Sequence, residues 1–134
     1  MSTERVRPGR LRPSQLYVSA EKLAAVLERV DGDTSDHEFG PLPVYEFDGE
    51  RRLTDGHTRA FAAYLTGAES VRVESDESLP AAYDIELYRE CLAWCETEGV
   101  ERIPDLVGRV LGPEAFERNW LDRCQRAADR LDEE

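Results

Sequence analysis

The sequence has few of the residues that mark specialised classes of protein. Of its 17 basic residues only one, Lys22, is a lysine, and 29 acidic residues give a formal net charge of −12. This balance argues against a protein whose main task is to neutralise a nucleic-acid backbone. An acidic, lysine-poor composition is also common in proteins of high-salt cytoplasm, and we favour this halophilic interpretation over a specific cationic partner.

Long apolar runs are also missing. No run approaches the ~20 residues that cross a bilayer, and the charged start, residues 1–12, lacks the apolar centre of a signal peptide. We therefore expect no membrane partner and a cytoplasmic location. A length of 134 residues favours a single domain with a modest core.

Paired metal-binding motifs are absent as well. The three cysteines, Cys91, Cys95 and Cys124, form no CxxC pair, and the two histidines, His37 and His57, lie far from them in the sequence. An odd number of cysteines without an export signal disfavours a disulfide framework. Buried apolar thiols are therefore expected rather than a zinc site.

The first 80 residues alternate between strand and helix patterns. Residues 42–47 and 51–54 read as two strands around the turn Asp48-Gly49, a strong hairpin signal. A helix with Ser19 as its N-cap precedes them, and residues 31–40 form a loop. A second helix ends at Gly67, and a strand follows over 70–74. The connection from the strand at 51–54 to the strand at 70–74 has the length of a crossover, which favours some parallel pairing.

The C-terminal part reads as helical. Its periodicity predicts a helix that ends near Gly99, a shorter helix from Ile103 to Gly112, and a final helix that starts at Pro113. Aromatic residues of these helices are expected to pack against the sheet. We predict an α+β fold with a small mixed sheet and a C-terminal segment of about three helices. The expected organisation is an extended, basic arm (1–11), an α/β core (12–78) and a helical extension packed on the core (79–134).

The most informative stretch joins a polar turn to an apolar helix, at Thr54 to Arg59. The backbone N–H groups of Gly56, His57 and Thr58 are expected in the first helical turn, unpaired and pointing outward, where they attract anions and phosphates above all. A structural interpretation is also open. Asp55 and Thr54 then cap the helix, Gly56 permits a tight turn, and Arg59 pairs with an acidic neighbour such as Glu50.

The same stretch carries a resemblance. The order Pro13-Ser-Gln-Leu, a helix, Pro41-Leu-Pro-Val, a hairpin, Thr54-Asp-Gly-His-Thr-Arg-Ala-Phe-Ala-Ala-Tyr and Val71-Arg-Val resembles the ParB/sulfiredoxin superfamily over about residues 12–75. In its chromosome-partition branch the loop binds a nucleoside triphosphate, and a helix-turn-helix domain reads DNA. The acidic C-terminal helices offer no basic recognition helix, so DNA is a disfavoured partner.

Two other branches make different predictions. Sulfiredoxins need a cysteine where this chain has His57, which disfavours their reaction. Asp55-Gly56-His57-Thr58-Arg59 is most similar to the loop of free-serine kinases. That resemblance implies a nucleotide (ATP, ADP or CTP) on the helix N-terminus, held by residues 56–59. It implies Asp55 near Mg²⁺ or the acceptor hydroxyl, His57 as a phosphate donor or proton shuttle, and Glu21 of the first helix as the nearest candidate base.

Two hypotheses follow. The first is a nucleotide-binding domain, with phosphotransfer to a small hydroxylated metabolite as its activity if the protein is an enzyme. In that case Asp55, Glu21 and His57 are the candidate catalytic residues, and Gly56, His57, Thr58 and Arg59 bind the nucleotide. The alternative is a non-catalytic interaction module, or a DNA-associated protein, whose partner is another protein or a second copy of the chain.

Overall fold

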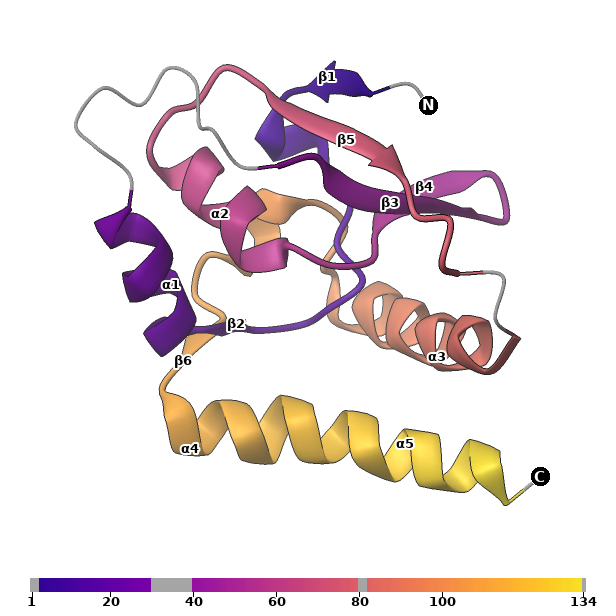
Figure 1. Cartoon of the computed structure of the whole chain (residues 1–134). Coiled ribbons are helices and arrows are strands. Elements are labelled where there is room, and N and C mark those ends of the chain that lie inside the picture. Colours follow the sequence, from indigo (N-terminus) through magenta and orange to yellow (C-terminus); the bar gives the residue numbers. More distant parts are fainter. Residues whose placement is uncertain (1–2, 30–39, 80–81, 134) are drawn as a thin grey trace.

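The protein has an α+β fold, seen in a computed structural model that describes residues 3–29, 40–79 and 82–133 (Figure 1). The loop predicted over 31–40 lies outside the described residues, apart from Gly40. The strands are β1 (Glu4–Val6), β2 (Val18–Ser19), β3 (Leu42–Phe47), β4 (Glu50–Leu53), β5 (Val71–Ser75) and β6 (Val110–Leu111). The helical elements are η1 (Pro8–Arg10), α1 (Ala20–Glu28), α2 (His57–Leu65), α3 (Ala82–Glu98), η2 (Ile103–Leu106), α4 (Pro113–Phe116), η3 (Glu117–Leu121) and α5 (Asp122–Asp132).

The predicted hairpin is present. β3 and β4 pair antiparallel, with Phe47 opposite Glu50. The two residues between them, Asp48 and Gly49, have φ angles of 50° and 86°. Positive φ at both central positions gives a turn whose twist matches that of the strands, which explains why Asp-Gly marks it.

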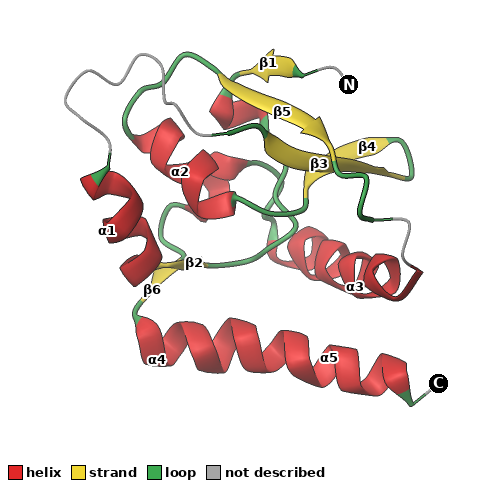
Figure 2. Ribbon diagram, in the orientation of Figure 1, coloured by secondary structure: helices red, strands yellow, loops and turns green. Residues whose placement is uncertain are grey.

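The sheet is mixed, in the order β1-β5-β3-β4 (Figure 2). The predicted parallel pairing occurs, but β5 pairs with β3 and not with β4. The chain therefore crosses over the hairpin's first strand through α2. Leu42 of β3 lies opposite Val73 of β5, and both are buried against the helices.

The N-terminal segment differs from the expected arm. Glu4–Val6 is extended, but it pairs antiparallel with β5 and forms an edge of the sheet. Pro8 and Leu11 are buried, and the Leu11 carbonyl accepts a hydrogen bond from Ile103 N–H at 2.9 Å. Strand pairing uses backbone groups, so a segment with little apolar content can still join a sheet edge.

The helices form two layers beneath the sheet. α2 and α3 lie closer to the strands, and α4, η3 and α5 run as one continuous helix below them (Figure 1). One hydrophobic cluster joins residues of both sequence halves, among them Phe61 of α2, Cys95 of α3 and Trp120 of η3. The expected packing of helix aromatics on the sheet occurs at Tyr88 of α3, whose ring centroid lies 5.8 Å from that of Phe47 of β3. Trp94 and Trp120 instead pack against each other, edge to face, with ring centroids 5.9 Å apart.

The predicted helix from Ile103 to Gly112 is wrong. Only Ile103–Leu106 is helical, as the 3-10 turn η2, and Gly108 then adopts a φ of 88°. Val110 and Leu111 pair in parallel with Val18 and Ser19 of β2 instead. The predicted caps hold elsewhere: Ser19 Oγ accepts from Lys22 N–H at the start of α1, and Pro113 opens the last helix.

Within the described residues, no helix combines the length and the apolarity that a membrane crossing requires.

Candidate functional site

The polar turn before α2 is built around Gly56. Its φ is 76°, and a Cβ atom placed there would lie 2.8 Å from Leu42 Cδ2. Both facts require glycine. The Gly56 N–H, expected to be unpaired, donates to Asp55 Oδ1 at 2.8 Å. The first helical hydrogen bond runs from Ala60 N–H to the Gly56 carbonyl, so the N–H groups of residues 57–59 precede it.

His57 points into the protein. Its side chain is 4% exposed, and its Nε2 accepts a hydrogen bond from Ser14 N–H at 2.9 Å. The Ser14 hydroxyl in turn donates to the Leu53 carbonyl at 2.6 Å. Burial lowers the pKa of His57 from 6.5 to about 4, and the nearby Asp55 charge opposes this shift only weakly. The ring is therefore neutral near pH 7 with its proton on Nδ1, and Nε2 cannot donate to a phosphate.

Arg59 lies over the same turn. A Cβ atom at Gly56 would lie 3.0 Å from Arg59 Nη2, so the guanidinium folds back toward the helix N-terminus. Among residues 3–29, 40–79 and 82–133, no carboxylate pairs with it. Glu50, the expected alternative partner, instead approaches Arg12 at 3.6 Å and Arg52 at 3.7 Å. The Arg59 guanidinium is thus available to an anion.

A pocket of about 380 Å³ opens at this turn. Asp55, Gly56, His57, Thr58 and Arg59 all line it, so the structure brings these predicted site residues together. Glu21 does not line it. It lies on the exposed first turn of α1, where a glutamate favours the helix dipole, so Glu21 is not placed to act as a base in this pocket.

Two further cationic residues, not expected from the sequence, line this pocket. Lys22 of α1 and Arg29, the residue directly after α1, line it, and both are exposed. They lie seven positions apart, which places them two turns apart on one helix face. That spacing, together with the fact that Lys22 is the only lysine, was the available signal.

The far wall of the pocket is apolar. Phe116, Trp120 and Leu121 of the C-terminal helix line it. Leu121 is 51% exposed, whereas Phe116 and Trp120 are mostly buried. A ligand in this pocket would meet cations at one side and an apolar surface at the other.

Metal-binding capacity is limited. In the part of the chain that the structure describes, no three His, Cys, Asp or Glu residues gather as a metal site. Among the described residues that line the pocket, Asp55 is the one with a carboxylate, and its Oδ1 already accepts from Gly56 N–H. Mg²⁺ is commonly held by one or two carboxylates together with substrate phosphates. Asp55 alone could therefore help to hold Mg²⁺ only with a phosphate ligand present.

The three cysteines are free. Cys91 and Cys95 are buried, as the sequence predicts, and Cys124 is half-buried on α5. Burial raises the pKa of the Cys95 thiol to about 11. The Cys95 thiol is therefore a poor metal ligand and nucleophile at neutral pH.

Searches of family models, of curated proteins and of solved structures each find no match for this chain. The likeness to the ParB/sulfiredoxin superfamily therefore stays a prediction from the sequence.

Proposed function

We propose that the pocket at the N-terminus of α2 binds a phosphate-bearing ligand, and that the ligand is a nucleotide. One observation carries the proposal: Lys22, Arg29 and Arg59 face the same pocket as the first turn of α2. In a chain of net charge −12, three cations around one hollow favour an anion at that place. Helix N-termini and the guanidinium groups of arginine both bind phosphate preferentially.

The residues divide the binding between them. In this proposal the N–H groups of His57 and Thr58, with the Thr58 hydroxyl, donate to phosphate oxygens. Arg59 offers a planar fork from the same turn, while Lys22 and Arg29 neutralise charge from α1. The apolar wall suits a base or another flat apolar group. The volume of about 380 Å³ lies within the range of roughly 300–1,000 Å³ for small-molecule sites.

Phosphotransfer is the activity that we propose if the site turns over. Mg²⁺, when bound with the nucleotide, would neutralise charge that develops on the transferred group. Asp55 is the pocket residue that could hold it or accept a proton from the acceptor hydroxyl. A second pocket of about 330 Å³ shares Gln15, His57 and Trp120 with the first and offers space for an acceptor.

Calorimetry tests the binding. ATP, ADP and CTP are titrated with and without Mg²⁺ into the protein and into Arg59→Ala. Arg126→Ala is the matched control, because Arg126 is exposed on α5 and its loss changes the net charge equally. We expect Arg59→Ala to weaken binding about tenfold or more and the control to leave it unchanged. Absence of heat with every nucleotide at millimolar concentration would contradict the proposal.

Asp55→Asn separates metal binding from simple capping. The amide oxygen can still accept from Gly56 N–H, but the negative charge is gone. Without Mg²⁺ we expect nucleotide to bind equally or more tightly, since a repulsive charge has been removed. Weaker binding only in the presence of Mg²⁺ would support Asp55 as a metal ligand. Tight nucleotide binding with no product formed from any hydroxylated acceptor would favour the non-catalytic alternative.

A further inference from the structure

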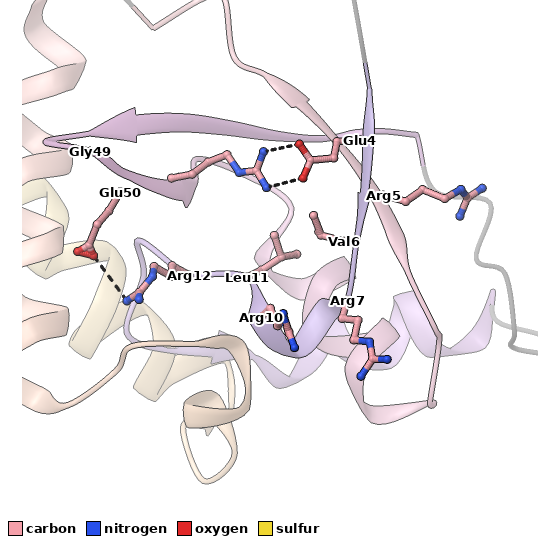
Figure 3. A pocket seen from close by; sticks show the side chains of 10 residues that line it. Glu4, Arg5, Val6, Arg7, Arg10, Leu11, Arg12, Gly49 and Glu50 are labelled. Atoms are coloured by element: carbon pink, nitrogen blue, oxygen red, sulfur yellow. Dashed lines mark hydrogen bonds and ion pairs between the residues drawn. The ribbon is translucent and has the colours of Figure 1, made fainter.

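A second hollow, of about 790 Å³, lies along the N-terminal segment, and none of its lining residues also lines the α2 pocket. We call it the arginine hollow. It lies between β1, η1, the segment after η1 and the β3–β4 turn (Figure 3). Five arginines and two glutamates line it: Arg5, Arg7, Arg10, Arg12, Arg51, Glu4 and Glu50.

The two glutamates are already paired. Glu4 accepts two hydrogen bonds from Arg51, at 3.0 and 3.1 Å, and Glu50 lies 3.6 Å from Arg12 (Figure 3). Val6 and Leu11 lie between these two pairs. These two pairs form part of the walls of the hollow, so both of the glutamates that line it are already engaged by arginines.

Arg7 directly precedes η1 and Arg10 is its last residue, and both are exposed. Neither has an ion-pair partner among the residues that the structure describes. Both also line a neighbouring hollow, together with Arg5 and the exposed Tyr64. The surface around η1 therefore carries an excess of positive charge on a strongly acidic protein.

The fold keeps these like charges close together. Backbone pairing of β1 with β5 and burial of Pro8 and Leu11 hold the segment in place, so its arginines cannot spread apart as they would in a free arm. Held cations repel one another, and a bound anion removes that repulsion. Guanidinium groups bind phosphate oxygens with two parallel hydrogen bonds, which makes phosphate a fitting ligand.

We propose that the arginine hollow is a second anion site, which takes a compact ligand with several phosphate charges and acts independently of the α2 pocket. A compact ligand fits better than a nucleic-acid strand, because Glu4 and Glu50 interrupt the hollow and Glu69 borders the neighbouring one. A long polyanion that leaves the hollow would also meet the acidic remainder of the surface.

Calorimetry with inorganic triphosphate tests the proposal in an Arg59→Ala background, which weakens the α2 pocket. The double variant Arg7→Ala/Arg10→Ala should weaken triphosphate binding about tenfold or more. The matched control, Arg118→Ala/Arg126→Ala, removes two exposed arginines of the C-terminal helix and should not weaken it. Loss of binding in both double variants, or in neither, would overturn the proposal.

Glu50→Gln is expected to tighten triphosphate binding, which damage to the fold would not do. It releases Arg12 and removes a negative charge from the wall, so triphosphate should bind about threefold more tightly. Glu114→Gln, an exposed change of equal charge elsewhere, should have no such effect. Unchanged or weaker binding in Glu50→Gln would contradict the proposal. A thymidine oligonucleotide that binds through Arg7 and Arg10 more tightly than triphosphate, with affinity that rises with length, would also overturn it.

Discussion

The turn at residues 54–59 and the N-terminal segment at residues 5–12 are both polar, but the fold uses their polar groups differently. In the turn, His57 is buried against Ser14, and the Gly56 N–H is bonded to Asp55. In the N-terminal segment, the backbone and Leu11 are built into the fold while Arg7 and Arg10 stay exposed. Residues of a motif that indicates ligand binding can thus serve partly to hold the fold together. A segment without a motif can carry an excess of positive charge.

The largest effect is expected at His57. His57→Ala leaves the Ser14 N–H without its acceptor and opens a cavity, so we expect a loss of about 4 kcal/mol in the free energy of unfolding. Urea denaturation measures it. A loss below about 1 kcal/mol would contradict a structural role of His57 in this turn.

The same residue predicts acid sensitivity. The folded protein holds His57 neutral down to about pH 4, whereas in the unfolded chain it takes up a proton near its ordinary pKa of 6.5. The contribution of neutral His57 to the free energy of unfolding is therefore complete above pH 6.5. It is lost as the pH falls toward 4, and the total loss is about 3 kcal/mol. His57→Gln, which does not titrate, should reduce this loss. An equal pH dependence in both proteins would contradict the assignment.

Leu11→Ala tests whether the N-terminal segment belongs to the core. Leu11 is 5% exposed, and its removal should lower the free energy of unfolding by about 3 kcal/mol. Leu65→Ala is the control, since Leu65 is 47% exposed and its loss should cost less than about 1 kcal/mol. Equal losses in the free energy of unfolding of the two variants would show that the N-terminal segment is a solvated arm and not part of the core.

Gly56→Ala separates backbone strain from crowding. The positive φ and the contact with Leu42 together should cost about 2 kcal/mol. Gly49→Ala shares the positive φ but meets nothing within 4 Å, so it should cost only about 1 kcal/mol. Thermal melts of the two variants compare them directly. If Gly49→Ala were the more harmful change, the tight packing inferred at the turn would be wrong.

The smallest stability effect is expected at Arg7 and Arg10. Because neither has an ion-pair partner in the described part of the chain, Arg7→Ala and Arg10→Ala should shift Tm by no more than about 1 °C. A slight rise is consistent with relief of repulsion between like charges. A marked fall in Tm would show that these arginines support the fold, as His57 does, and would contradict the difference inferred between them.

Local signals predicted much of the fold. The Asp48-Gly49 turn, the Ser19 cap and the breaks at Gly67 and Gly99 depend on backbone preferences that a short window contains. The strand pairing of residues 4–6 and of 110–111 depends on partners far away in the sequence, and a stretch of two or three residues has no readable periodicity. Local patterns therefore predict an arm where residues 4–6 form a sheet edge, and a helix where residues 110–111 form β6.

The candidate site was predictable in part for the same reason. Residues 55–59 are contiguous, so their gathering in one pocket follows from the turn itself. The inward direction of His57 depends on Ser14, which lies 43 positions away, and no local pattern reports it. The contribution of Lys22 and Arg29 depends on how α1 packs beside α2.

The short ladder between β2 and β6 has a consequence for the order of folding. It joins residues about 90 positions apart and directly precedes both α1, which supplies Lys22 and Arg29, and the C-terminal helix, which supplies Phe116 and Trp120. Closing so long a loop is entropically costly, so these contacts are expected to form after the local β3–β4 hairpin. The anion pocket would then be assembled late on the folding pathway, and a ligand bound there would slow unfolding more than it speeds folding.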